Sequence, residues 1–229
     1  RAELSAFTES LAKLRSESRT VEIEFTLTRH DAVFRQTTEF DCRFVMVRAK
    51  DGTQNGMLRL RRTDGPPDTE TWLLRGTNLY EFNDRSRIIT VHTGTDGNVL
   101  AYAAGPWPGL WLLDRDQVAK RCEVRVFKRD AHYRYFEVTV GENRNTWAYR
   151  LAVARHDNSV RQVFCARPNG DTEHLKVSKW AVDAGVTTDD FPDPDRLHDG
   201  WKLVEWPGRD KLWERLAKKT PEPPARPNQ

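Results

Sequence analysis

The sequence lacks the long apolar run and the cysteine pairs that would place it in several common classes. No stretch approaches the ~18 apolar residues that a helix needs to cross a bilayer. The three cysteines, Cys42, Cys122 and Cys165, form no CxxC motif, which argues against a zinc site. Cys42 alternates with Phe40 and Phe44, so we predict a buried thiol there, with a disulfide as the alternative. The sequence therefore predicts neither a transmembrane helix nor a zinc ion.

Recognisable catalytic motifs are also missing. The six histidines are scattered without an HExxH pattern, and no serine or cysteine lies in a nucleophile motif. Five aspartates and His198 gather between residues 189 and 199, but their spacing is not that of an EF-hand. We predict a solvated acidic loop there rather than a metal site, and we expect no cofactor and no enzymatic activity. An enzyme acting on an envelope polymer is a weaker alternative, which requires two carboxylates to converge in a cleft.

An excess of positive charge is missing as well. The chain has 37 basic and 34 acidic residues, a net charge of +3, so we predict no nucleic-acid partner. Apolar residues make up 38% of the chain, a modest share, but eight Trp and ten Phe supply large rings for a core. The chain starts at Arg1 without a signal-peptide pattern, which fits a mature secreted domain or a shortened chain.

Short alternating stretches fill most of the sequence. Between about residues 21 and 182, apolar and polar side chains alternate with the period of two that is typical of a half-buried strand. Turn residues such as Asp157-Asn158 separate the stretches. The alternation slips near Tyr135/Phe136 and near Lys179/Trp180, which predicts β-bulges there. The pattern predicts one large antiparallel sheet with one buried face.

Other segments depart from the strand pattern. Helices are predicted over residues 2–18, from Asp114 to about Lys120, and around Leu212 to Leu216, where apolar residues recur every three to four positions or an N-cap residue is present. Residues 106–113 are apolar and rich in proline, residues 187–200 form a loop, and residues 201–206 form a last strand or a cover. We predict one domain over residues 1–220 and a disordered tail over residues 221–229.

Several landmarks follow one another in a familiar order. They are GMLRLRR at 56–62, RGTNLYEFND at 75–84, PGLWLL at 108–113, VARHDNSV at 153–160, DFPDP at 190–194, and Gly200. This order resembles the periplasmic lipoprotein-carrier superfamily of the LolA/LolB type, in particular the planctomycete-type outer-membrane-lipoprotein-sorting-like domains. The resemblance extends from about residue 3 to about residue 206.

The resemblance implies a mainly β (α+β) fold. We expect a single antiparallel, strongly curved half-barrel of about eleven strands, with helices packed on its concave face. An incompletely filled concavity would hold acyl chains. We expect residues 106–113 to cover its mouth, although core packing also explains Trp107 and Trp111. The aromatic stripe that includes Tyr135 and Tyr149 belongs either to the core or to the wall of the ligand site.

The expected function is that of a periplasmic or otherwise extracytoplasmic carrier for a lipid or a lipidated protein, and an envelope protein is a further expected partner. The alternative is a non-catalytic structural or protein-interaction domain whose concavity is filled by its own side chains. Eight residues are predicted to line or cover the cavity: Trp72, Leu74, Trp107, Leu110, Trp111, Tyr135, Trp147 and Tyr149.

Overall fold

A computed structural model describes residues 9, 18–66, 68–93, 122–140, 147–195 and 200–206 of the 229-residue chain. The helices predicted over residues 2–18, 114–120 and 212–216, the predicted cover and the predicted tail lie outside the described residues. Glu9 and Ser18 are the exceptions in the first of these segments: Glu9 is helical and exposed, whereas Ser18 is buried and not helical. Among the described residues, no helix is both long and apolar enough to cross a membrane.

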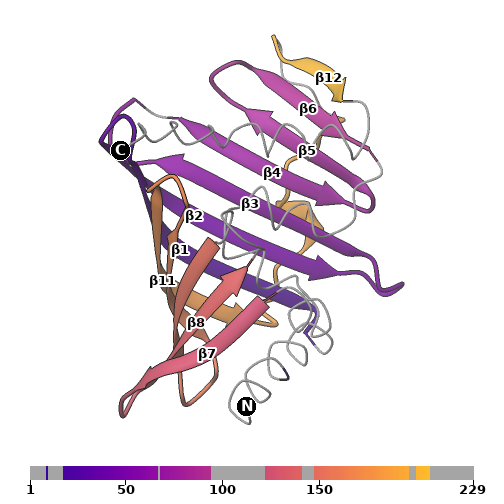
Figure 1. Ribbon diagram of the computed structural model, residues 1–229. Helices are drawn as coiled ribbons and strands as arrows, with labels where there is room; N and C mark the ends of the chain where they lie inside the picture. Colours follow the sequence, from indigo (N-terminus) through magenta and orange to yellow (C-terminus); the bar gives the residue numbers. More distant parts are fainter. Residues whose placement is uncertain are drawn as a thin grey trace.

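Twelve strands form one open, curved sheet (Figure 1). Their order across the sheet is β12-β6-β5-β4-β3-β2-β1-β11-β10-β9-β8-β7. Their bounds are β1 Thr20–Asp31, β2 Gln36–Arg48, β3 Gln54–Arg62, β4 Thr69–Arg75, β5 Asn78–Asn83, β6 Ile88–His92, β7 Cys122–Arg129, β8 Tyr133–Val140, β9 Trp147–Ala154, β10 Val160–Ala166, β11 Thr172–Val182 and β12 Lys202–Trp206. A short 3-10 helix, η2, covers Thr188–Asp190.

The prediction of a mainly β fold with a large, open antiparallel sheet is confirmed, with one correction. About eleven antiparallel strands were expected, whereas the twelfth strand, β12, pairs with β6 in the parallel direction, Lys202 opposite Ile88. After β11 the chain packs Phe191 on one face of the sheet and enters the far edge at Lys202, opposite Ile88 at the start of β6. Because β12 starts where β6 starts, the two strands run in the same direction. Alternation in the sequence does not reveal the direction of a strand.

The sheet is centred on β1, which pairs with β2 on one side and with β11 on the other. Val21 lies opposite Met46 of β2 and Val182 of β11, so strands that are far apart in the sequence share one register. Because successive side chains of a strand point to opposite faces, this register decides which residues become buried together.

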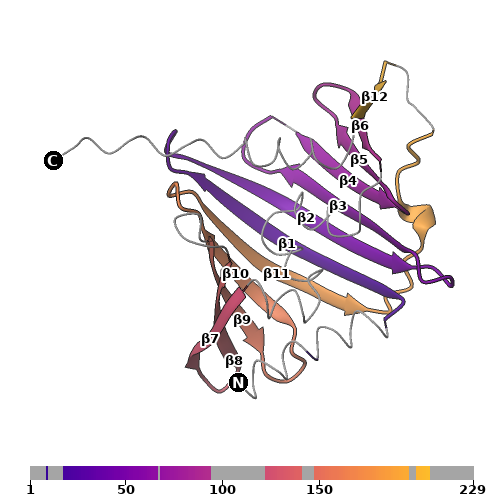
Figure 2. The same ribbon diagram turned by 45° about the vertical axis from the view of Figure 1, so that its right-hand side comes forward.

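Register shifts mark three places where the sheet bends. They lie at Phe127 of β7 opposite Tyr135 and Phe136, at Ser178 of β11 opposite Glu24 and Phe25, and at Arg161 of β10. The shift at Ser178 confirms the prediction near Lys179/Trp180. The prediction near Tyr135/Phe136 is corrected, because the extra residue is Phe127 on the partner strand β7. An extra residue on one strand increases the local twist. The strands β7–β10 turn steeply away from the β2–β6 half (Figure 2).

The concave face carries the main core. We call its buried members the concave cluster, and they come from every strand from β1 to β5 and from β8 to β11: Val21, Ile23, Phe25, Leu27, Cys42, Phe44, Met46, Leu58, Leu60, Trp72, Leu74, Leu79, Phe136, Val138, Tyr149, Leu151, Val153, Val160, Val163, Cys165 and Leu175. All twelve strands belong to one sheet, so within the described residues no second sheet packs on this face.

A smaller core lies on the opposite, convex face, over strands β2 to β6. This convex cluster consists of Val45, Met57, Leu73, Phe82, Ile89, Val91 and Phe191. Phe191 comes from the segment between β11 and β12, which passes behind the sheet in Figure 1, and Trp201 packs edge-on against Phe82 with ring centroids 6.4 Å apart. The turn before Phe191 is closed by a hydrogen bond from the Thr187 amide to the Asp190 carboxylate. The crossing segment is therefore held by packing as well as by the β12 ladder.

Replacing Phe191 by alanine should lower the free energy of unfolding by about 3 kcal/mol, because a ring that is 7% exposed would be lost from the convex cluster. Urea unfolding measures this change. Hydrogen exchange should also show faster exchange at residues 202–206. The matching substitution Phe34→Ala, at a ring that is 73% exposed, should change neither measurement. Equal effects of the two substitutions would contradict the packing described here.

Candidate functional site

The concave cluster includes three of the eight residues that the sequence predicts for the cavity. Trp72 and Leu74 lie on β4, Tyr149 lies on β9, and each is at most 7% exposed. The Trp72 indole N–H donates to Glu70 Oε1 at 2.8 Å, so its polar atom is satisfied while the ring belongs to the apolar face. Tyr149 likewise forms a side-chain hydrogen bond with Cys165. The structure thus brings these three predicted residues onto one face.

The other five predicted residues are placed differently. Tyr135 alternates with the buried Phe136 and points to the convex face, where its hydroxyl donates to Asp130 Oδ2 at 2.9 Å. Trp147 is the first residue of β9, and its backbone pairs with that of Val140 in β8. The structure does not describe the Trp147 side chain. Trp107, Leu110 and Trp111 lie outside the described residues.

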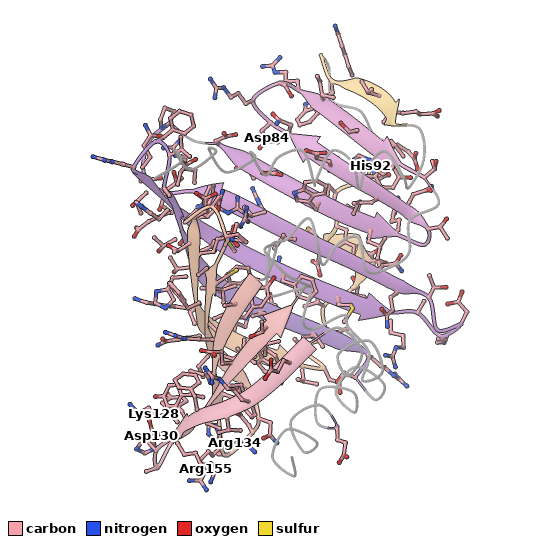
Figure 3. The ribbon with its side chains drawn as sticks, viewed as in Figure 1. Asp84, His92, Lys128, Asp130, Arg134 and Arg155 are labelled. Carbon is pink, nitrogen blue, oxygen red and sulfur yellow. The ribbon has the colours of Figure 1, made fainter. Side chains whose placement is uncertain are left out.

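Sequence analysis missed a buried polar pair on the concave face, Glu81 and His92. Glu81 shares a face of β5 with Leu79, and His92 lies directly opposite Leu79 on β6. His92 Nε2 is 3.5 Å from Glu81 Oε2, and the two side chains are 2% and 10% exposed. Within the described part of the chain, neither ring nitrogen of His92 forms a hydrogen bond. The ring lies nearly parallel to that of Trp72, with centroids 6.5 Å apart (His92 is labelled in Figure 3).

A second polar group lies at the other end of the concave face and was also missed. Arg29 Nε donates to Glu173 Oε1 at 3.1 Å, and Arg167 donates to the same oxygen at 2.8 Å. The Glu173 side chain is 4% exposed, while those of Arg29 and Arg167 are 33% and 25% exposed. The Arg29 guanidinium also lies over the Phe40 ring, 5.2 Å from its centroid. This end therefore carries two cations and one carboxylate.

The alternation of apolar and polar residues in the sequence contained a signal for both buried carboxylates, Glu81 and Glu173. Glu81 and Glu173 occupy strand positions whose neighbours two residues away, Leu79 and Leu175, are buried. A charged residue in such a position needs a partner, because burying an unpaired charge is costly. The partners could not be read from the sequence, since His92 and Arg29 reach them through strand pairing.

The two buried carboxylates of the concave face do not form a catalytic pair. Glu81 lies on β5 and Glu173 on β11, five strands apart in the sheet order, and each has its own basic neighbour. Asp84, at the end of β5, has a pKa above its usual range, mainly because of partial burial. Within the described ranges, no three His, Cys, Asp or Glu side chains are placed to bind a metal ion.

Cys42 and Cys165 are free, buried thiols on the concave face, so the prediction for Cys42 is confirmed. Burial raises the pKa of each thiol to about 12, because the thiolate would lose its hydration. Both thiols are therefore protonated at neutral pH and are poor nucleophiles.

The sequence matches no protein-family model and no curated protein. Solved structures with a similar arrangement include MucB, at a TM-score of 0.47 and 15% identity over 87% of this chain. A DUF1329 family protein from Desulfovibrio piger is similar at 0.48 and 11% identity, covering 85% of this chain and 98% of that one. A LolA superfamily protein from Nitrosomonas europaea is similar at 0.41 and 10% identity, covering 82% and 97%.

The chain spans 64% of the MucB chain, less than two thirds of its length.

The substitution Cys122→Ser leaves Cys42 and Cys165 as the thiols to be labelled. In the folded protein both should react with a thiol reagent at pH 8 at least a hundredfold more slowly than an exposed thiol. The reason is that a pKa of about 12 leaves almost no thiolate and that both sulfur atoms are buried. In denaturant, both thiols should react quickly and completely. Rapid labelling of the native protein at either position would contradict the burial of this face.

Proposed function

We propose that this protein is a non-enzymatic, extracytoplasmic binding protein that holds the acyl chains of a lipid or lipidated protein against the concave cluster. One observation carries the proposal: the apolar side chains of one face of an open, curved sheet form a single cluster from β5 to β8. The extracytoplasmic location follows from the resemblance of the sequence to periplasmic carriers.

Hydrophobic burial alone can supply the affinity. Each buried methylene contributes about 0.8 kcal/mol, so ten of them contribute about 8 kcal/mol, which corresponds to a dissociation constant near 1 µM before the costs of ordering. A site of this kind requires shape and apolar contact rather than a nucleophile or a metal. Trp72, Leu74 and Tyr149 would provide part of this contact.

Polar groups at the ends of the concave face favour an amphipathic cargo. The chains would lie over the apolar middle, and the head group would lie near Arg29 and Arg167. Both side chains contact the Glu173 carboxylate and are 33% and 25% exposed, so an anionic head group would meet two cations at this end of the face.

The cover belongs to this proposal. The helices predicted over residues 2–18 and 114–120, together with residues 106–113, would close the concave face over the chains. Trp107, Leu110 and Trp111 would then contact the cargo from the opposite side, and Trp147 would extend the lining formed by Tyr149. Opening of the cover would release the cargo to a membrane or to a partner protein.

Native mass spectrometry of the purified protein should show bound lipid, and extraction should release it. In the delipidated protein, fluorescent fatty-acyl probes of increasing length should bind three- to fourfold more tightly per added methylene, as expected for complete burial. No co-purifying lipid, together with an affinity that is independent of chain length, would instead support the alternative of a protein-interaction domain with a filled concave face.

Two adjacent leucines of β4 provide a matched test of which face binds the probe. Leu74 belongs to the concave cluster and Leu73 to the convex cluster, and both are at most 3% exposed. Leu74→Ala and Leu73→Ala should each destabilise the protein by about 2–4 kcal/mol. Only Leu74→Ala should weaken probe binding, by at least about threefold, the contribution of one buried methylene. Equal probe affinities of the two variants would contradict binding on the concave face.

A further inference from the structure

A row of aromatic rings crosses the convex side of β7 and β8 and leads to the tip of their hairpin. Phe127 and Tyr135 have ring centroids 6.1 Å apart, Tyr135 and Tyr133 6.2 Å, and Tyr133 and His132 6.4 Å. Phe127 is 47% exposed, and Val126, the residue before it, packs against the concave cluster on the other face. Phe127 is the extra residue of the β7 bulge.

Cations lie over the rings of this row. Lys128 Nζ is 5.4 Å from the Tyr135 centroid, and the Arg150 guanidinium is 5.8 Å from that of Phe127. Arg150 and Arg125 both contact Glu137, so this carboxylate neutralises only one of the two arginines. Over residues 122–140 and 147–166 there are seven Arg and Lys and four Asp and Glu, an excess equal to the net charge of the whole chain.

The hairpin tip is organised before any partner binds. Asp130 Oδ1 accepts hydrogen bonds from the His132 and Tyr133 amides at 2.8 and 2.7 Å, and its Oδ2 accepts one from the Tyr135 hydroxyl. These amides lower the pKa of Asp130, so the carboxylate remains charged and keeps the turn in place.

A second turn lies beside the first. Arg155 donates to the Asp130 carbonyl oxygen at 3.1 Å, and Arg134 donates to Asn158 Oδ1 in the turn between β9 and β10. Lys128, Asp130, Arg134 and Arg155 gather at one end of the sheet (Figure 3). The two turns therefore present their cations together.

We propose that this surface, which we call the aromatic–cationic patch and define as Phe127, Lys128, His132, Tyr133, Tyr135, Arg150 and Arg155, docks the protein on a membrane that contains anionic lipids. The inference goes beyond acyl binding and does not depend on it, since the patch lies on the other side of the sheet from the concave cluster.

The chemistry of the patch fits a lipid surface for two reasons. Aromatic rings with polar edges, such as Tyr133 and Tyr135, are favoured at the level of the head groups, and the exposed Phe127 ring can enter the acyl boundary. Lysine and arginine side chains near an anionic leaflet each strengthen binding by about fivefold. Glu137 and Asp157 lie among these cations, so the patch is not the uninterrupted basic stripe expected for nucleic acid.

Flotation or sedimentation of the full chain with vesicles tests the proposal. We use phosphatidylcholine vesicles with and without about 30% phosphatidylglycerol, at salt concentrations that bracket ~0.15 M, where the Debye length is near 8 Å. Binding should require the anionic lipid and should weaken as salt increases. Absence of binding, equal binding to neutral vesicles, or binding only to a protein or nucleic acid would overturn the proposal.

Matched variants locate the contact. Lys128→Glu should weaken vesicle binding by at least about tenfold, because it reverses one charge, and Phe127→Ser should weaken it and reduce its salt-resistant part. The controls are Lys176→Glu, at an exposed lysine of β11, and Phe34→Ser, at the β1–β2 turn; both should bind as the unmodified protein does. If the controls weaken binding as much as the patch variants, the patch is not the docking site.

Acyl binding is measured on the same proteins. Lys128→Glu and Phe127→Ser should keep the acyl-probe affinity and the unfolding midpoint of the unmodified protein. Loss of vesicle binding with retained probe binding would support docking through the patch. Vesicle binding that persists in a protein unable to bind acyl probes would leave the docking inference intact and would disprove only the proposed cargo.

Discussion

The central constraint on this structure is the register of β1 between β2 and β11. A shift by one residue would turn Ile23 and Phe25 toward solvent and bring Glu22 and Glu24 into the concave cluster. Glu22 has a defined place on the convex side, where Arg43 and Lys179 each contact its carboxylate at 2.7 Å and their hydrogen bonds lower its pKa. Apolar burial on one face and these ion pairs on the other therefore select the same register. Every strand further from the centre inherits its inward and outward positions from this choice.

The concave face combines a wide apolar middle with polar groups at its ends, which is an unusual composition for a simple core. A buried pair such as Glu81 and His92 contributes little net stability, because desolvation offsets the attraction between its members. The ring nitrogens of His92, which form no hydrogen bond with the described residues, add a further cost. A structure whose only requirement was a stable core would be better served by leucine in these positions. Retaining polar groups there is physically reasonable if they contact a polar part of a bound molecule.

The two sides of the sheet have different tasks under the proposals made here. The concave side would hold the cargo, and the convex side holds the crossing segment over β2–β6 and presents the aromatic–cationic patch over β7 and β8. Bulges increase the local twist of the sheet, and one of them lies at Phe127, whose ring is 47% exposed. The same residue therefore belongs to an irregularity of the sheet and to the surface proposed to meet a membrane.

The sequence by itself determined the strands, most of their turns and one of the bulges, because these depend on side-chain alternation and on residues such as Asn158 that accept a positive φ. It also identified Trp72, Leu74 and Tyr149 as inward-facing. Only the tertiary structure decided that β12 runs parallel to β6, that Tyr135 faces outward, and that Glu81 meets His92 and Glu173 meets Arg29. The physical reason is that alternation and turns act between neighbours in the chain, whereas pairing partners depend on strand register. That register joins consecutive strands for Glu81 and His92, and strands more than a hundred residues apart for β1 and β11.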